Sequence, residues 1–335
     1  MKILVLRFSS IGDIVLTTPV VRCLKKQLDA EVHFLTKAAF APILAANPHV
    51  DRVFSFQKEV TEVLPDLKNE GYDFVVDLHH NLRSLRVKLV LGRPARSFDK
   101  LNFEKWLLVR MGIDRLPDVH IVQRYMATVE SLGVKYDGAG LDFFILPDQE
   151  FNLKNALITH NSLLIVPPVA FVIGATHATK RLPTAKIIET CRLIRRPVVL
   201  LGGKAEAAAG KEIASQAGSH VLDLCGRLSL MQSASVVRQA EIVVTHDTGL
   251  MHIAAAFGKK IVSIWGNTVP KFGMYPFYPD GVALNQSIEI QGLACRPCSK
   301  IGHDRCPRGH FRCMNDIDPA QIARAVDDGR KTVDG

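Results

Sequence analysis

The stretch "VVTHDTGLMHIAAAFGKKIVSIWG", residues 243–266, decides the fold because it reads as strand, turn, helix and strand without interruption. Its β-branched start favours a buried strand, and the alanine-rich run after the turn favours a helix. The turn contains Asp247, Thr248 and Gly249. Free backbone N–H groups and the positive end of the helix dipole meet at such a turn, which suits a diphosphate. Simple capping of the helix by Asp247 or Thr248 is the structural alternative.

Strands and helices alternate in the same way along the whole chain. In the first half, strands are expected at residues 2–6, 31–36, 52–56 and 74–78, and helices at 14–28 and 60–70. In the second half, strands are expected at residues 170–175, 197–203, 220–226, 241–247 and 260–266, and helices at 184–195 and 205–217. This alternation predicts an α/β fold built from βαβ units. Two Rossmann-like, doubly wound parallel sheets in tandem are the simplest arrangement.

The two sheets are expected to form two domains, residues 1–155 and 156–335, because a chain of 335 residues is long for one domain. The linker is expected between residues 146 and 168, a proline-containing region of weak pattern, although "SLLIV" within it also fits a strand. Ligands of doubly wound sheets bind beyond the carboxyl ends of the strands. Two such domains therefore predict a cleft with one substrate on each side.

A second loop after a strand, "GATHATKRLP" at residues 174–183, combines hydroxyl donors and cations. Thr176 and Thr179 offer hydroxyl groups, and Lys180 and Arg181 offer positive charge, a combination that suits a leaving diphosphate. A basic loop without a ligand is the alternative. The presence of the "HDTGLMH" turn in the same predicted domain favours the diphosphate.

The stretch "RFSSIGDIV", residues 7–15, has the position of a phosphate-binding turn, because it follows the first strand and opens a helix. It lacks the glycine pattern of a dinucleotide site, and it places an acid, Asp13, where an anion would bind. A capping role for Asp13 is the structural alternative.

Three segments together resemble glycosyltransferase family nine, the ADP-heptose:lipopolysaccharide heptosyltransferases. They are "ILVLRFSSIGDIVLTTPVVRCLK", "GATHATKRLP" and "THDTGLMHIAAAFGKKIVSIWGNT", and the resemblance covers nearly the whole chain in order. It implies a GT-B architecture, in which an N-terminal domain binds the acceptor and a C-terminal domain binds the nucleotide sugar across a cleft. It also implies an inverting transfer of heptose from ADP-heptose to the lipopolysaccharide inner core, on a lipid A/Kdo-type acceptor. No metal or other cofactor is implied as necessary.

The resemblance also implies roles for individual residues. Asp13 matches the general base, which stands opposite the departing diphosphate. The residues matched to donor binding are Thr176, Lys180, Gly226, Leu228, Asp247, Thr248, Gly249, Leu250 and His252. Those expected on the acceptor side are Ser9, Ser10, Gly12, Asn81, Arg83 and Arg86. The arginines belong to a basic segment, residues 81–100, whose charge suits an anionic partner such as a phosphorylated substrate, an acidic lipid surface or nucleic acid, and a solvated helix face is the alternative. The resemblance places this segment in the acceptor domain, where it would meet the anionic glycolipid.

The composition is that of a globular protein, with 47% hydrophobic and 22% charged residues and a formal charge of +9. No apolar run reaches the roughly 18 residues of a membrane span, and a strand pattern begins directly after Met1 without a signal sequence. We therefore expect a cytoplasmic protein. Its basic surface and anionic glycolipid acceptor suggest peripheral contact with the cytoplasmic face of the inner membrane.

Four of the seven cysteines gather in "CRPCSKIGHDRCPRGHFRC", residues 295–313. A CxxC pair followed by two further thiols fits structural zinc, but the second pair is spaced more widely than in an ordinary zinc knuckle. Buried free thiols are the alternative, and disulfides are least expected in a cytosolic chain.

Two other functions stay open on the sequence alone. One is another GT-B enzyme, such as a sugar-nucleotide epimerase, which has the same fold but no separate acceptor. The other is a nucleic-acid-binding protein that uses the basic, cysteine-rich segment. Only 7% of the residues are aromatic, so stacking platforms for bases are scarce and no nucleic-acid partner is expected.

Overall fold

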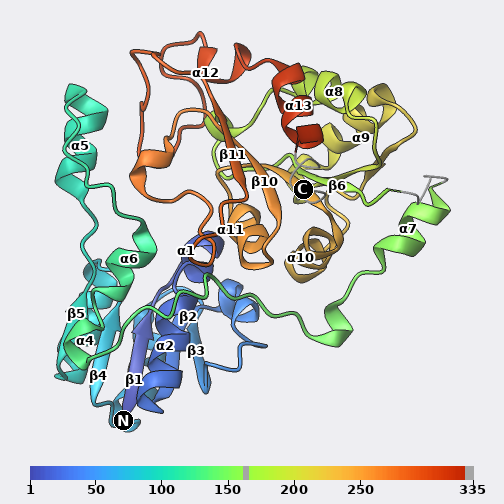
Figure 1. Cartoon of the computed structure of the whole chain (residues 1–335). Helices are drawn as coiled ribbons and strands as arrows, with labels where there is room; N and C mark the ends of the chain where they lie inside the picture. Colours follow the sequence, from blue (N-terminus) through green and yellow to red (C-terminus); the bar gives the residue numbers. More distant parts are fainter. Residues whose placement is uncertain (161–165, 329–335) are drawn as a thin grey trace.

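The computed structural model describes residues 1–160 and 166–328 and contains two parallel β-sheets (Figure 1). The first has the strand order β3-β2-β1-β4-β5, and the second has the order β11-β10-β9-β6-β7-β8. Neighbouring strands in both sheets are parallel. Each order reverses next to the first strand of its sheet, as in a Rossmann fold. The predicted α/β class with two doubly wound sheets is therefore confirmed.

The predicted strands are present, with small differences at their ends. They are β1 (Lys2–Leu6), β2 (Glu31–Lys37), β3 (Arg52–Phe56), β4 (Phe74–Asp77), β6 (Val169–Val172), β7 (Val198–Leu201), β8 (Val221–Asp223), β9 (Ile242–His246) and β10 (Lys260–Trp265). Two edge strands were not predicted, namely β5 (Ala95–Ser97) and β11 (Asn285–Glu289). Both are short or polar, and β11 buries only Ile288, so neither has the continuous apolar run of a central parallel strand.

The first half contains helices α1 (Ile11–Val15), α2 (Thr18–Leu28), α3 (Leu64–Asn69), α4 (Leu82–Leu91), α5 (Asn102–Met111) and α6 (Ile121–Met126), with 3-10 turns η1 (Ala38–Ile43), η2 (Val60–Val63) and η3 (Glu130–Leu132). The prediction of one continuous helix at residues 14–28 is wrong. This segment is divided into α1 and α2, and Pro19 lies in the first turn of α2, where its missing N–H is harmless.

The second half contains α8 (Thr184–Leu193), α9 (Ala207–Ala217), α10 (Leu230–Gln239), α11 (Gly249–Ala256), α12 (Arg312–Asn315) and α13 (Pro319–Asp328), with 3-10 turns η5 (Ala178–Lys180), η6 (Lys204–Glu206) and η7 (Pro270–Phe272). The predicted helices at residues 184–195 and 205–217 correspond to α8 and to η6 with α9. No helix in the described part of the chain is long and apolar enough to cross a bilayer.

The predicted linker is partly helical, because it contains η4 (Pro147–Gln149) and α7 (Leu153–Thr159). The strand suggested at "SLLIV" falls mostly on residues 161–165, outside the described residues. Segment 150–151 already contacts α10 of the second sheet, where Phe151 N donates to Ser235 Oγ over 3.0 Å. The predicted boundary at residues 155/156 falls within α7 and stays a prediction.

Helices α1 and α11 bring the two halves together at the centre of the molecule (Figure 1). A Cβ atom at Gly12 would lie 2.5 Å from Cδ2 of His252, and one at Gly249 would lie 2.6 Å from Cγ2 of Ile11. Real Cβ atoms do not approach other atoms so closely, so glycine at both positions permits this approach. One hydrophobic core continues from the first sheet across this contact into the second.

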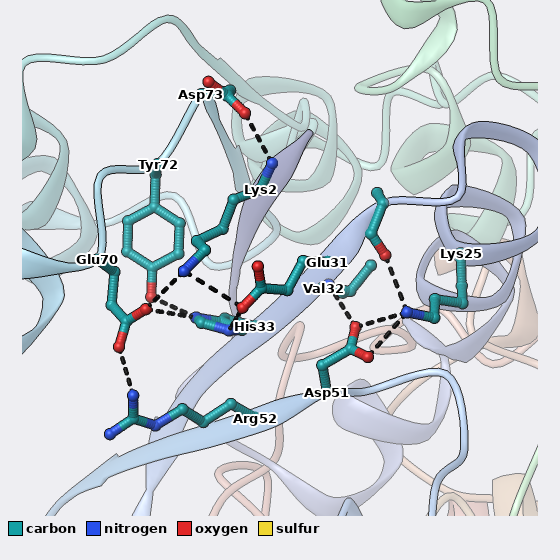
Figure 2. A network of polar contacts seen from close by, with 11 residues as sticks. Lys2, Lys25, Glu31, Val32, His33, Asp51, Arg52, Glu70, Tyr72 and Asp73 are labelled. Carbon is teal, nitrogen blue, oxygen red and sulfur yellow. Dashed lines mark hydrogen bonds and ion pairs between the residues drawn. The ribbon is translucent and has the colours of Figure 1, made fainter.

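A network of charged side chains lies at the amino ends of β1, β2 and β3, the sheet edge opposite the α1–α11 contact (Figure 2). Glu31, His33 and Glu70 form the only group of three or more metal-type ligands within 4.8 Å of one another in the described residues. The Lys2 ammonium already lies 3.2 Å from Glu31 and 2.8 Å from Glu70. An internal cation therefore balances these acids, and the network fastens the first strands together.

Candidate active site

A cavity of about 430 Å³ lies between the carboxyl ends of the two sheets, where α1 and α11 meet. Residues from the loops after β1, β6 and β9 line it, and these strands flank the points where the strand order reverses. Ligand sites of doubly wound sheets are expected at such points. The cavity brings together the following predicted residues: Ser10, Gly12, Asp13, Thr176, Lys180, Asp247, Thr248, Gly249 and His252.

Asp13 lies in the first turn of α1 and is held by two neighbours. One carboxylate oxygen is 2.7 Å from Nη2 of Arg7, and the other accepts hydrogen bonds from Ser10 N at 3.1 Å and Ser10 Oγ at 2.8 Å. Burial disfavours the charged form, but the Arg7 guanidinium and the Ser10 hydrogen bonds outweigh it and lower the pKa of Asp13. Asp13 therefore supports the start of α1 and also presents an ionised carboxylate to the cavity.

Arg7 is a site residue that the sequence analysis did not assign. Its buried guanidinium donates to the backbone oxygens of Ser9 at 2.8 Å and Leu78 at 2.6 Å, and to the Tyr125 hydroxyl at 2.9 Å. These bonds use the donors that do not face Asp13. A planar group tied at three points fixes the position of its fourth partner, so Arg7 sets the orientation of Asp13.

The opposite wall contains an ion pair from the second half. Lys180 Nζ lies 2.6 Å from Asp247 Oδ2, which also accepts a hydrogen bond from Thr268 Oγ1 at 3.0 Å. Thr248 is the N-cap residue of α11, yet its side chain makes no capping hydrogen bond. The geometry therefore does not show Asp247 and Thr248 acting as helix caps. The first N–H groups of α11 lie beside the cavity.

A cluster of cations forms a third part of the wall. Lys100, Lys105 and Lys300 line the cavity, and Lys300 Nζ donates to Asn102 Oδ1 over 3.2 Å. Burial, followed by the charges of Arg124 and Lys300, lowers the pKa of Lys105 to about 8. Within the described residues, Lys100 and Lys105 have no acidic partner at ion-pair distance. The cluster is therefore short of negative charge.

The lysine cluster joins distant parts of the chain, since Lys100 and Lys105 belong to the first half and Lys300 to the cysteine-rich segment. That segment is fastened to the "GATHATK" loop, where Thr179 N and Oγ1 donate to His303 O at 3.1 and 3.0 Å. Lys100 lay in the basic segment recognised from the sequence, but no local pattern connects it with Lys300.

His252 closes the cavity floor beside Gly12. Burial, only partly offset by the negative charges of Asp247 and Asp13, lowers the pKa of His252 to about 4, so the ring is neutral at physiological pH. His246 is also buried, and its Nε2 accepts a hydrogen bond from Leu182 N at 2.9 Å. His246 therefore fixes the "KRLP" end of the neighbouring loop.

Several predicted acceptor residues do not line the cavity. Ser9 contributes a backbone oxygen to Arg7, and Asn81 caps α4 by accepting a hydrogen bond from Ser84 N at 3.0 Å. Arg83 lies 3.7 Å from Glu59 on the surface, and Arg86 is also exposed. The structure therefore places Asn81 at the start of α4 and Arg83 and Arg86 on α4, outside the cavity that contains Asp13.

Three predicted donor residues also lie outside the cavity wall. Gly226 has φ +73° beyond β8, and its N–H donates to Gly202 O at 2.9 Å. Leu228 and Leu250 are half-buried and pack against the core. Gly226 and Leu228 still follow the carboxyl end of β8, the same sheet edge as the cavity.

The cysteine-rich segment does not form a preorganised zinc site. Four thiolates around zinc lie within about 4 Å of one another, whereas Cys295, Cys298, Cys306 and Cys313 form no group of three within 4.8 Å in the described residues. Cys295 Sγ lies 3.7 Å from His310 Nε2, and Cys313 is buried against the core. All seven cysteines are free thiols. Zinc binding stays a prediction.

Known proteins similar to this chain were found by sequence and by structure. It is 24% identical over 295 residues to lipopolysaccharide heptosyltransferase 1 of Campylobacter coli, covering 80% of this chain and 84% of that protein. It is 24% identical over 341 residues to lipooligosaccharide heptosyltransferase 2 of Haemophilus influenzae, covering 95% and 96%. The structure of E. coli ADP-heptose lps heptosyltransferase II covers both chains completely, with a TM-score of 0.74 and 21% identity.

The structural likeness supports the GT-B arrangement of the two sheets. The model of glycosyltransferase family 9 (heptosyltransferase) matches residues 60–309, which is well over half of the chain. That match includes the lysine cluster and both loops that border the cavity on the side of the second sheet. The chain is therefore a glycosyltransferase, and it belongs to glycosyltransferase family 9, the heptosyltransferases.

Proposed function

We propose that this enzyme transfers a heptose, with inversion, from ADP-heptose to the inner core of lipopolysaccharide. The observation that carries the proposal is that Asp13 and the Lys180–Asp247–Thr248 wall face one cavity from the two sheets. Related proteins named as lipopolysaccharide heptosyltransferases support the choice of reaction. The proposed acceptor is an anionic glycolipid of the lipid A/Kdo type.

On the donor side, Lys180 and the first N–H groups of α11 would hold the diphosphate. Thr176 and Thr248 add hydroxyl donors at the same wall. As the bond between the sugar and the diphosphate breaks, negative charge develops on the departing oxygen. A cation and a helix N-terminus placed there stabilise that charge more in the transition state than in the ground state.

On the acceptor side, Asp13 would take the proton of the attacking hydroxyl. The hydroxyl oxygen bonds to the anomeric carbon while the carbon–oxygen bond to the diphosphate breaks, and the proton passes to the carboxylate of Asp13. The lowered pKa keeps Asp13 ionised at neutral pH, which this step requires. No metal or other cofactor has a necessary part in these steps, so activity should persist in a chelator.

The acceptor's anionic groups would meet Lys100, Lys105 and Lys300. These cations lie in the cavity with Asp13, whereas Arg83 and Arg86 lie on α4 outside it. A phosphate or carboxylate bound there would balance the cluster and hold the sugar hydroxyl near Asp13. The predicted acceptor contacts of Asn81, Arg83 and Arg86 then belong to more distant parts of the glycolipid.

The direct test measures ADP release from ADP-heptose, with and without a deep-rough lipopolysaccharide acceptor. Acceptor-dependent release is expected. An epimerase of the same fold would consume the nucleotide sugar without an acceptor, and a nucleic-acid-binding protein would do neither. If no nucleotide heptose or hexose supports acceptor-dependent ADP release, the proposal is wrong.

A further inference from the structure

Helix α5 exposes an unusual amount of apolar surface. None of its residues is buried, and Phe103 and Trp106 are 63% and 51% exposed. Their rings stack with centroids 6.3 Å apart. At 100° per residue, Phe103, Trp106 and Arg110 fall within an arc of about 60° and share one face of the helix. Figure 1 shows α5 standing away from both sheets.

Helix α4, which lies at the left of Figure 1 as α5 does, carries a second exposed apolar face. Leu82 and Leu89 are 84% and 73% exposed, and Leu85 lies between them on the same face at helical spacing. The opposite face of α4 is buried through Ser84 and Val87. The leucines are thus not needed for the attachment of α4 to the sheet.

Exposed arginines accompany both apolar faces. Arg83 and Arg86 lie on α4 and Arg110 on α5, and Arg93 and Arg96 follow α4. Among the acids of this region, Glu59 lies 3.7 Å from Arg83 and Asp114 pairs with Lys271. Asp99 accepts a hydrogen bond from Leu101 N, and neither Asp99 nor Glu104 forms an ion pair with another described residue. Apolar side chains between arginines are complementary to an anionic lipid surface, which has negatively charged headgroups above apolar acyl chains.

Helix α5 also connects this surface with the active site. Asn102 and Lys105 lie on another face of α5 and line the cavity that contains Asp13. One helix therefore presents aromatic side chains outward and an anion-binding lysine inward. A lipid-anchored sugar bound at the outer face of α5 would therefore be separated from the cavity only by the width of this helix.

We propose that the exposed faces of α4 and α5 dock the enzyme on an anionic lipid bilayer, with Phe103 and Trp106 inserted at the interface and the arginines on lipid phosphates. This docking is a property separate from the transfer reaction. It rests on the proposed function in one respect only, namely that docking would serve to deliver a lipid-linked acceptor. Aromatic and apolar groups at an interface, with arginines beside them, bind by burial and by charge together.

Tryptophan emission of the full chain tests the docking without any donor or acceptor. The chain has two tryptophans, Trp106 and Trp265, and Trp265 is 1% exposed. Vesicles of phosphatidylglycerol and phosphatidylethanolamine should shift the emission to shorter wavelength and protect it from acrylamide. Phosphatidylcholine vesicles, or high salt, should reduce the effect strongly. A Trp106→Phe variant should lose the signal while still binding vesicles.

Co-sedimentation with vesicles compares the binding of two matched double variants. Phe103→Ser combined with Trp106→Ser should reduce the vesicle partition coefficient at least about tenfold, because the main apolar contact is lost. Ile158→Ser with Leu193→Ser removes exposed apolar residues from α7 and α8 and should leave partitioning unchanged. ADP release with a water-soluble acceptor without lipid chains should be equal in both variants, because none of these residues lines the cavity.

Three results would overturn the docking proposal. They are no binding to anionic vesicles, equal binding of the Phe103/Trp106 variant, and protection of Trp106 by concentration-dependent self-association without lipid. The last result would make this face an interface between copies of the chain. Failure of ADP release with any acceptor, in contrast, would reject the transferase proposal and leave vesicle binding unaffected.

Discussion

Two side chains, Arg7 and Asp13, define the chemistry of the first half of the site. Their contact of 2.7 Å is part of a chain of bonds that runs from Tyr125 through Arg7 to Asp13. In the proposed role of general base, a carboxylate that a fixed neighbour keeps ionised would always be ready to accept a proton, but it would be a weaker base than a free carboxylate. The pair therefore favours availability and orientation over basicity.

Asp13→Asn should keep the affinity for the nucleotide sugar and lower kcat about a hundredfold or more, the usual scale for loss of a general base. Titration of ADP binding and steady-state rates measure the two effects separately. Lys180→Ala serves as a contrasting variant, because it should weaken donor binding as well as rate. Near-normal turnover of Asp13→Asn would reduce Asp13 to its structural role at the start of α1.

Arg7→Met should shift the pH profile of kcat. Burial raises the pKa of Asp13, and the Arg7 charge is the largest effect that lowers it. Without that charge, the carboxylate becomes protonated at higher pH, so the acidic limb of the profile should move toward neutral pH and kcat should fall. Arg7→Lys should restore part of the shift, and circular dichroism should verify folding. An unmoved acidic limb would show that Arg7 has no influence on the base.

At the scale of elements, α1 and α11 meet through glycine, and this is one of the contacts that join the two βαβ arrangements. Gly12→Ala would place a Cβ atom 2.5 Å from the His252 ring, which is itself buried. We expect a loss of about 1–3 kcal/mol in the free energy of unfolding, the usual range for overpacking, together with a lower kcat because Asp13 follows directly in the same turn.

Chemical unfolding and steady-state kinetics check the Gly12 prediction. Gly203→Ala is the matched control, because a Cβ atom there meets its nearest neighbour only at 3.4 Å, an ordinary contact. That variant should behave like the parent protein. A Gly12→Ala variant of unchanged stability and rate would mean that α1 and α11 tolerate a wider separation.

The sequence predicted the central strands of both sheets. It did not predict the edge strands or the interruption between α1 and α2. Strands such as β1 and β9 are buried along almost their whole length, so they appear as continuous apolar runs. The edge strand β11 is largely exposed and polar, and its pairing with β10 depends on tertiary contact. The break between α1 and α2 was missed because both helices carry apolar residues at helical spacing.

Across the whole molecule, the residues that share a turn were predictable and those brought together from distant segments were not. Asp13, Lys180 and Thr248 each belong to a recognisable strand-to-helix turn. Arg7 follows the end of a strand, where the sequence alone does not distinguish it from a surface arginine. Its role depends on contacts with Leu78 and Tyr125, which are distant in the sequence. The meeting of Lys105 with Lys300 depends on how the two halves are placed, which no local pattern records.

The lysine cluster gives a pH prediction for the assembled site. The pKa of Lys105 is about 8, so its positive charge is present below that pH and is lost as pH rises through it. The KM for an anionic acceptor should therefore increase above pH 8, while the KM for the donor changes less. Lys105→Arg should abolish this increase, because guanidinium stays charged. The same pH dependence in Lys105→Arg would assign the titration to another group.

The ion pair of Lys180 with Asp247 has a consequence for selectivity among cellular anions. A lysine already neutralised at 2.6 Å gains little from a singly charged anion, which must displace Asp247 and lose its own hydration. A diphosphate brings more charge and several acceptor oxygens, so it repays the exchange. In the proposed donor site, the wall would thus discriminate by charge number, and chloride should compete poorly with a nucleotide.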